Sequence, residues 1–407
     1  MPLTRSNSSS ASDFRTAGQE QLSLALIGAR NHALHLASQF EKAPAVHSQA
    51  LQLLGHAAWF QEWWIARNVQ RGLGQGCDGS AARLASIDPR ADDTWRVPCA
   101  HGSAGTKVDT AKLPDDAHTR TYLLETLETT LELLEKAGDS DAGLYFFRLA
   151  LFHEDRTAEE LLILAQGQGQ ELPVQLPGPG TQREPLLVPA TRWRTGFGAG
   201  EGFAFDNEQP AFDDPVPVFE IDAQAVCWAQ FVEFVDDGGY DHENLWHPDG
   251  WAWLSQKAAL EGRRAPRFVD QIGVASGAVM QTRFGKPRRM LGGQCATHLS
   301  WFEADAWARW AGRRLPTEVE WEVAAHVALR RGFHWGDVWE WTASTFRPYP
   351  GFKPGPWVDY SQAAFGSQKV LRGASFATPA RIRSSRFRHF AAPEQDGLFC
   401  GFRSCGI

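Results

Sequence analysis

Apolar residues recur at spacings of three and four from about residue 13 to residue 166, and few Gly or Pro interrupt them. This spacing puts the apolar side chains on one face of an α-helix. The pattern predicts four long helices, over residues 13–43, 45–68, 118–137 and 142–166. Two of the connections are short and one, over residues 75–113, is long. This combination predicts a four-helix bundle with one crossover, spanning residues 13–166.

The pattern changes at residue 167. Residues 167–185 have no periodicity and are rich in Gln, Gly and Pro, which is typical of a linker. Beyond the linker, short β-type runs and many turns surround two predicted helices, over residues 300–314 and 316–326. The second domain, over residues 186–407, is therefore predicted to be loop-rich, and the whole chain falls in the α+β class.

The composition agrees with two domains. The chain has 407 residues, of which 43% are hydrophobic and 22% charged, so it can bury two separate cores. Thirteen of its seventeen Trp follow residue 190, which indicates two different kinds of domain. A net charge of −8 argues against nucleic acid or an anionic membrane as the main partner, because both attract basic surfaces. The chain has no apolar run of about 18 residues and no signal peptide pattern, so we expect a cytoplasmic protein.

Two histidines lie within apolar helical stretches. His56 is in LLGHAAWFQEWW and His153 is in FFRLALFHEDRTAEELL. An imidazole without a partner is costly in such surroundings, so each ring either bonds a neighbouring carbonyl or binds a ligand. Helix bundles commonly build metal sites from side chains that point inward from different helices. The two histidines are therefore candidate metal ligands, and a mononuclear iron site would need a third ligand.

Motifs of the second half follow the order of a known domain. They include GFAFDNEQP, GRRLPTEVEWEVAA, GDVWEWTAS and, last, GFRSC. Together they resemble the formylglycine-generating-enzyme-like domain, a C-type-lectin-like fold, in the form found in sulfoxide synthases of ergothioneine biosynthesis. GHAAWF and FHEDRTAEE resemble the histidine motifs of the DinB-like bundle that precedes this domain in those synthases. The resemblance covers nearly the whole chain, and it implies a DinB-like four-helix bundle followed by the lectin-like domain.

This resemblance implies an iron enzyme. In that family Fe(II) held by three histidines binds O2 and couples imidazole C2 of hercynine to a sulfur donor. His56 matches the first ligand and His153 the second, while Thr157 stands where the third histidine is expected. Residues 153, 157 and 160 share one helix face, so Glu160 is expected to complete the metal site as a carboxylate ligand. Glu159 matches the family's trailing carboxylate, which is expected to orient a ligand.

Positions near the C-terminus bear on the substrates. The family's Arg-Asn-aromatic segment is Arg388-His389-Phe390 in this chain. Phe390 keeps the aromatic face that attracts a trimethylammonium group, and His389 is expected to replace the Asn as a polar contact. Ala391 and Ala392 follow where members that use γ-glutamylcysteine have an Asp, so this thiol is disfavoured as the donor.

The family's proton-donating Tyr lies in a Pro-Tyr-x-x-Tyr-Ser segment. Tyr360 is the Tyr that remains of that segment and is the expected proton donor. A selenol is more acidic than a thiol and needs less acid–base help. Together with the missing thiol anchor, this favours the related selenoneine synthases, which join hercynine to a selenosugar. The alternatives are an ergothioneine-type sulfoxide synthase that uses cysteine, and a non-catalytic lectin-like binding protein with a degenerate metal site.

Other features have simpler interpretations. Copper-dependent formylglycine generation needs two reactive Cys after VLRGAS, and SFATPARIRSS contains none, which argues against that activity. The six Cys are too sparse for a disulfide scaffold and are expected to be free thiols. The Trp-rich segments are expected to form core. The acidic residues of LPTEVEWE and VWEW are expected to form ion pairs with arginines such as Arg313, Arg314 and Arg372.

Overall fold

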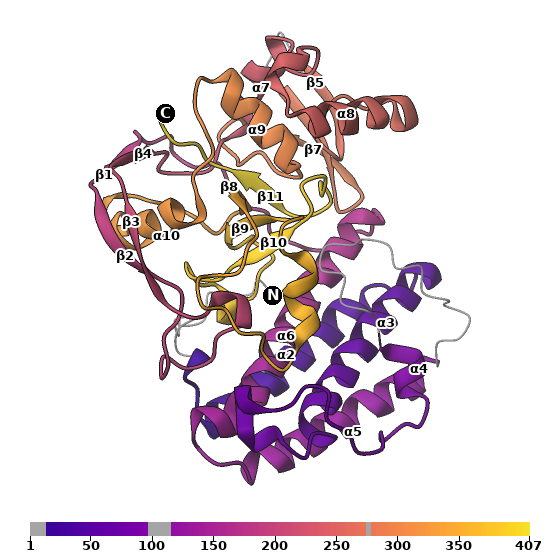
Figure 1. The fold of residues 1–407 in the computed structure, drawn as a ribbon. Helices are drawn as coiled ribbons and strands as arrows, with labels where there is room; N and C mark the ends of the chain where they lie inside the picture. The colour runs from indigo at the N-terminus through magenta and orange to yellow at the C-terminus, as the bar shows by residue number, and fades with distance from the viewer. Residues whose placement is uncertain (1–13, 97–114, 274–277) are drawn as a thin grey trace.

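The computed structural model describes residues 14–96, 115–273 and 278–407. Its N-terminal half is a bundle of four long helices (Figure 1). These are α2 (Gln19–Ser38), α3 (Pro44–Gln61), α5 (Asp116–Glu135) and α6 (Asp141–Gly167). The crossover between α3 and α5 contains a π-helical turn, η1 (Glu62–Ala66), and two short helices, η2 (Arg71–Gly76) and α4 (Ala91–Trp95). The predicted four-helix bundle is confirmed, although the helix ends differ from the predicted ones by several residues.

Helix α6 is the element that brings the candidate residues inside the molecule. Its N-cap is Ser140, whose side chain accepts a hydrogen bond from the N–H of Gly143. It packs against both α2 and α3, and most of its side chains are buried. The segment that follows His153 is therefore enclosed, which constrains the protonation of every titratable group that it carries.

The C-terminal half consists of short strands and helices joined by long loops (Figure 1). One sheet has the strand order β10-β9-β8-β11, in which β11 runs parallel to β8 and the other pairs are antiparallel. Its strands are β8 (Trp339–Thr345), β9 (Lys369–Gly373), β10 (His389–Ala391) and β11 (Cys400–Phe402). Two smaller sheets pair β1 (Leu186–Val188) with β4 (Phe219–Ile221), and β2 (Thr191–Thr195) with β3 (Phe212–Val216). A third contains β5 (Val269–Gly273), β6 (Ala278–Arg283) and β7 (Lys286–Met290).

The helices of this half are α7 (Trp228–Asp236), α8 (Pro248–Glu261), α9 (Trp301–Trp310) and α10 (Glu318–Val327). The last two lie where the sequence predicts helices. Each begins with a reciprocal capping box, Ser300 with Glu303 and Thr317 with Glu320. The other short helical turns are η4 (Asp206–Glu208), η5 (Glu243–Leu245), η7 (Leu329–Arg331), η8 (Val358–Tyr360), η9 (Gln362–Ala364) and η10 (Ala380–Ile382).

Buried ion pairs connect these short elements, as the sequence predicts. Glu318 accepts hydrogen bonds from Arg372 (3.0 Å) and Arg388 (2.7 Å). Glu340 pairs with Arg403 at 2.5 Å. All three guanidinium groups are almost completely buried. The expected framework of carboxylates and arginines is confirmed for Arg372 and for Arg314, which pairs with Glu320, whereas Arg313 pairs with Glu220 and Asp222 instead.

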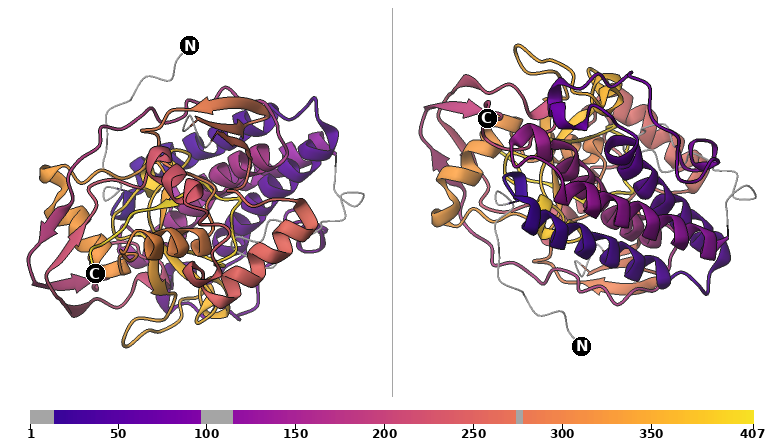
Figure 2. Two further views of the ribbon diagram at one scale, coloured as in Figure 1. Left: turned by 90° about the horizontal axis from the view of Figure 1, so that it is seen from above. Right: turned by 90° about the horizontal axis from the view of Figure 1, so that it is seen from below.

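The two halves stack face to face. Figure 2 shows the helices in front when the molecule is seen from below and the C-terminal domain in front when it is seen from above. One continuous cluster of buried apolar side chains includes residues of both halves. Ion pairs also cross the junction, among them Arg15 with Glu208 (2.8 Å) and Asp155 with Arg381. The junction between the two halves is therefore packed, and both halves contribute side chains to it.

Within the three described ranges, no helix is both long and apolar enough to span a bilayer.

Candidate functional site

The structure brings His56 and His153 together at the junction of the two halves. His56 lies on α3 and His153 on α6, and their ring centroids are 5.3 Å apart. Phe60, one turn after His56, stacks on the His153 ring at 3.8 Å with an interplanar angle of 7°. Trp357, from the C-terminal half, meets Phe60 edge-on at 4.6 Å. Two imidazoles from different helices therefore lie in the same cluster of aromatic rings.

Both imidazoles are held in their neutral form. The Nδ1 atom of His56 lies 2.8 Å from the carbonyl oxygen of Trp95. A carbonyl only accepts, so Nδ1 carries the proton and Nε2 keeps its lone pair. Burial lowers the pKa of His56, although the Trp95 bond acts in the opposite direction. Burial, followed by the influence of His56 and Arg156, lowers the pKa of His153 well below its ordinary value. Neutral imidazole is the form that binds metals.

The Trp95 carbonyl is positioned by close packing against a glycine. A methyl group added at Gly55 would lie 2.1 Å from Nε1 of the buried Trp95 indole. We expect Gly55→Ala to displace Trp95, to weaken its hold on His56 and to lower the free energy of unfolding by about 1–3 kcal/mol. Gly28→Ala in the middle of α2, where a methyl group meets only one atom at 4.0 Å, is the matched control and should be neutral or stabilising. Urea unfolding measures both, and equal effects would contradict the packing argument.

Two nitrogen ligands fit Fe(II), and the described residues place no third histidine beside them. His153 Nδ1 is buried with no hydrogen-bond partner among them. The Thr157 hydroxyl donates to the carbonyl of His153 (3.2 Å), so it is used within the helix. No group of three His, Cys, Asp or Glu that could hold a metal occurs in the part of the chain that is described. Burial raises the pKa of Glu160, against the opposing charge of Arg156, and its role as third ligand stays a prediction.

The other carboxylates of this helix segment have structural partners. Glu154 pairs with Arg30 of α2 at 2.5 Å, and Asp155 pairs with Arg381. Glu159 accepts hydrogen bonds from Trp339 (2.8 Å), Ser375 (2.6 Å) and Thr378 (3.0 Å). These three donors belong to the C-terminal half. The expectation that Glu159 orients a histidine is therefore replaced by a different role, because its described hydrogen bonds join α6 to the lectin-like domain.

Tyr360 adjoins the site from the C-terminal half. Its ring stacks on Phe205 at 4.8 Å and lies 4.7 Å from the ring of Trp357. Burial is the main cause that raises the pKa of Tyr360, so the phenol is protonated at neutral pH. Nη1 of Arg156 donates to the Tyr360 oxygen at 3.2 Å. Tyr360 therefore adjoins the histidine pair through both Trp357 and Arg156.

His389 and Phe390 lie on β10 and differ in accessibility. Phe390 is 1% exposed and stacks on Phe346 at 4.1 Å, and Tyr360 approaches its ring at 5.7 Å. Its faces are thus occupied by the core rather than presented to a ligand. His389 is partly exposed, and its ring is 4.9 Å from that of Trp339. Burial, followed by the charge of Arg156, lowers the pKa of His389 well below its ordinary value.

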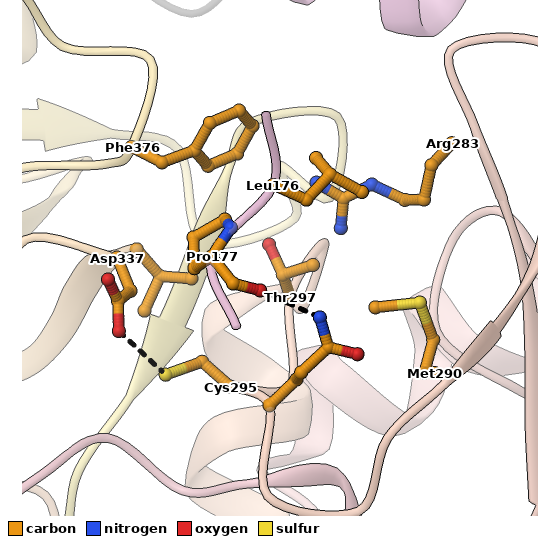
Figure 3. Close-up of a pocket in the computed structure, with 10 residues that line it drawn as sticks. Leu176, Pro177, Arg283, Met290, Cys295, Thr297, Asp337 and Phe376 are labelled. Carbon is orange, nitrogen blue, oxygen red and sulfur yellow. Dashed lines mark hydrogen bonds between the residues drawn. The ribbon is translucent and has the colours of Figure 1, made fainter. Parts of the chain in front are cut away.

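A cavity beside residues 176 and 177 has different chemistry (Figure 3). Leu176 and Pro177 line it together with Cys295, Asp337 and other residues of the second half. Its volume of about 20 Å³ holds roughly one water molecule. Burial, followed by Asp337, raises the pKa of Cys295, whose Sγ lies 3.8 Å from that carboxylate. The thiol is therefore protonated, and the cavity is too small for a substrate.

Acid should destabilise the metal-free protein through the two neutral imidazoles of this site. Below about pH 6.5 the unfolded chain protonates them, whereas the folded site keeps them neutral. The unfolded state then binds more protons, so the free energy of unfolding falls as pH falls, by up to about 1.4 kcal/mol per pH unit for each histidine. Urea midpoints at pH 7.5 and 5.5 measure this slope. This slope should be shallower in His153→Leu than in the wild type. Equal slopes would contradict the conclusion that His153 stays neutral in the folded protein.

Sequence reasoning did not find Arg156, Trp357 or Phe60 as parts of this site. The helical period could have indicated Arg156, because it lies three residues after His153 and hence on the same side of α6. Phe60 is likewise one turn after His56. Trp357 lies in a loop, where no period applies.

Comparisons with known proteins agree with the predicted resemblance. Residues 177–337 and 333–405 match the Sulfatase-modifying factor enzyme 1-like domain. The hercynine oxygenase of Mycolicibacterium smegmatis is 31% identical, covering 95% of this chain and 98% of the relative. That of Mycolicibacterium thermoresistibile is 30% identical, over 94% of each chain. The formylglycine-generating enzyme of Streptomyces coelicolor is 28% identical over 49% of this chain and 82% of its own. Because the first two alignments span nearly the whole chain, the protein belongs to the hercynine oxygenase family, with a sulfatase-modifying factor enzyme 1-like domain as its C-terminal half.

Proposed function

We propose that the protein is an O2-dependent non-haem iron enzyme that forms a C–Se or C–S bond at imidazole C2 of hercynine. The observation that carries this proposal is the pair of neutral imidazoles, His56 and His153, at the junction of the domains. Membership of the hercynine oxygenase family supports hercynine and O2 as substrates.

His56 and His153 would hold Fe(II), and Glu160 is the proposed third ligand. Bound Fe(II) would supply the binding and activation of O2. The Trp95 carbonyl fixes the His56 ring so that Nε2 is the atom available for the metal. Phe60 and Trp357 border the ring of His153. We assign Tyr360 as the proton donor of the reaction, because its phenol is protonated at neutral pH.

We favour a selenosugar as the donor. Ala391 and Ala392 follow Phe390, and neither offers a charge for the amino acid end of γ-glutamylcysteine. The reaction replaces the C2–H bond of the imidazole by a bond to selenium or sulfur. The C2–H bond and the Se–H or S–H bond both break, and their hydrogens leave in water with one oxygen atom of O2. The other oxygen atom stays on selenium or sulfur as the selenoxide or sulfoxide, so O2 accepts the four electrons. Cysteine is the alternative donor.

The test is product formation with defined donors. The protein, reconstituted anaerobically with Fe(II), is mixed with O2, hercynine and, in parallel, a selenosugar, cysteine or γ-glutamylcysteine, and products are identified by mass spectrometry. We expect a selenium adduct of hercynine. An adduct with cysteine alone would assign the sulfoxide synthase activity instead. No adduct from iron-loaded protein with any donor would refute the synthase proposal.

A non-catalytic binding protein is the second candidate. The observation that favours it is Thr157, whose hydroxyl bonds the carbonyl of His153 in place of a third imidazole. The iron content after reconstitution separates the two candidates. Less than about a tenth of an equivalent, in protein that remains folded, would support the binding protein.

A further inference from the structure

Arg283, at the end of β6, has a buried guanidinium group. It is 3% exposed, and its Nη1 donates to Oε1 of the neutral Gln281 at 3.3 Å. Within residues 14–96, 115–273 and 278–407, its Nε has no hydrogen-bond partner. The ring centroids of Phe376 and Phe399 are 5.7 Å and 6.0 Å from the guanidinium carbon, at the outer limit of a cation–π contact. Buried charges are normally paired, so this guanidinium is a candidate ligand for an anion.

The neighbouring charges do not balance that of Arg283. Burial, followed by the charge of Arg288, lowers the pKa of Arg283 to about 10, so the group is still charged at neutral pH. Burial, followed by the charge of Arg283, lowers the pKa of the buried His298 well below its ordinary value. Arg403, which is also buried in this half, pairs with Glu340. Arg283 has no such carboxylate in the described part of the chain.

The cavity of about 20 Å³ adjoins this guanidinium. Figure 3 shows the Arg283 side chain extending toward Thr297, which also lines the cavity. Thr297 is 3% exposed, and its Oγ1 has no hydrogen-bond partner among the residues that the structure describes. Asp337 lines the cavity on the side away from Arg283 in this view, and its carboxylate faces Cys295 and His334. Two unused donors, one of them charged, therefore border the same space.

Hydrogen bonds fix the walls of this cavity. Gln166, near the end of α6, donates from Nε2 to the carbonyl of Thr282 at 3.0 Å. Its Oε1 accepts from the N–H of Phe284 at 2.9 Å, so the residues on both sides of Arg283 are held. Gln294 donates to the carbonyl of Pro177 at 2.7 Å. The donors are thus held in place before a ligand binds, which favours binding.

The size and the charge of the cavity select the ligand. A space of about 20 Å³ accommodates roughly one water molecule or one monatomic anion, whereas phosphate and sulfate are larger. Water would satisfy the hydrogen bonds but would leave the buried charge of Arg283 without a counterion. A halide ion supplies both the acceptor and the negative charge.

We infer that Arg283 and Thr297 bind a chloride ion in this cavity. The N–H groups of Arg283 and the hydroxyl of Thr297 are its donors. The ion neutralises a charge that is buried where α6, residues 176–177 and β6 meet, and so it stabilises the folded protein. Neither residue belongs to the proposed iron site, and the chloride site does not depend on the proposed function.

The experiment compares the thermal unfolding of the full chain in chloride and in gluconate at equal ionic strength. The Tm of the wild type should be at least about 2 °C higher in about 0.2 M chloride, because a ligand of the folded state stabilises it by mass action. Arg283→Met removes the charge and should abolish this difference, and Thr297→Val should reduce it. Arg289→Met, at an exposed arginine on β7, is the matched control and should keep the difference.

Bromide locates the ion directly. Crystals grown in bromide should show an anomalous scattering peak in contact with the Arg283 guanidinium. Water alone in the cavity, or equal Tm values of the wild type in the two salts, would overturn the inference. A chloride effect that persists in Arg283→Met would place the ion elsewhere and also overturn it. If Arg283→Met does not fold, the bromide peak of the wild type and the Thr297→Val variant decide.

Discussion

Replacing His153 by alanine is expected to lower iron affinity by more than about 100-fold and to abolish turnover. The described residues offer two imidazoles for Fe(II), so removing one leaves a single nitrogen ligand on α3. Loss of a group that merely supports a ligand already costs 10- to 100-fold in affinity, and loss of a ligand should cost more. Iron content after anaerobic reconstitution and desalting measures the effect independently of activity.

The control is His35→Ala, at an exposed histidine near the end of α2. It should keep the iron content of the wild type. If His153→Ala also keeps that content while folded, His153 is not a ligand and the two-histidine site is wrong. Circular dichroism establishes whether each variant is folded.

Thr157→His extends the same test in the opposite direction. Position 157 lies one helical turn after His153, on the same face of α6, so a third imidazole would join the other two. We expect iron affinity to rise at least about 10-fold, since three imidazoles complete the ligand count of a catalytic site. The gain should vanish in the double variant with His153→Ala. An unchanged affinity would show that this helix face does not reach the metal.

The bundle could be predicted from sequence because its signal is local and repeated. The apolar residues of α6 follow the helical period over 27 residues, and Ser140 marks its start. Helix α7 was not predicted, since nine residues are too few for that period to stand out. Helix α8 buries only Gly250, Trp253 and Leu254, so its apolar stripe is weak.

The candidate site could be predicted only in part. His56 and His153 stand out because an imidazole in an apolar helix needs a partner. The burial of Phe390 did not follow from its motif, because its neighbour Phe346 comes from a separate segment of the chain. Trp357 lies in a loop between β8 and β9, where the backbone of Pro356 packs against Gly79 of the crossover. Contacts of this kind depend on the assembled fold rather than on local sequence.

Replacing Glu318 by alanine is expected to lower the free energy of unfolding by about 3–5 kcal/mol, because it leaves the buried guanidinium group of Arg388 without its charge partner. Arg388 loses its carboxylate, while Arg372 keeps Glu322 at 3.0 Å. Burial alone would raise the pKa of Glu318, but the charges of Arg388 and Arg372 outweigh it and lower that pKa, so the carboxylate is ionised. Lys257→Ala, which removes an exposed ion pair with Glu261 on α8, is the control and should cost less than about 1 kcal/mol. Equal shifts in the urea midpoint would contradict this difference.

The Glu318 variant also distinguishes the metal-binding side of the proposed site from its substrate-binding side. Arg388 directly precedes His389, and its other hydrogen bonds reach the carbonyls of Asn207 and Arg347, so it holds the start of β10 in place. Its displacement should weaken substrate binding, whereas His56 and His153 lie on the bundle helices, and the hydrogen bonds of Glu318 join Arg372 and Arg388 of the C-terminal half. We therefore expect Glu318→Ala, kept cold enough to stay folded, to retain iron but to lose affinity for hercynine, the reverse of the order expected for His153→Ala. If both properties were lost together in Glu318→Ala, the metal-binding and substrate-binding sides would form one cooperative unit across the domain junction.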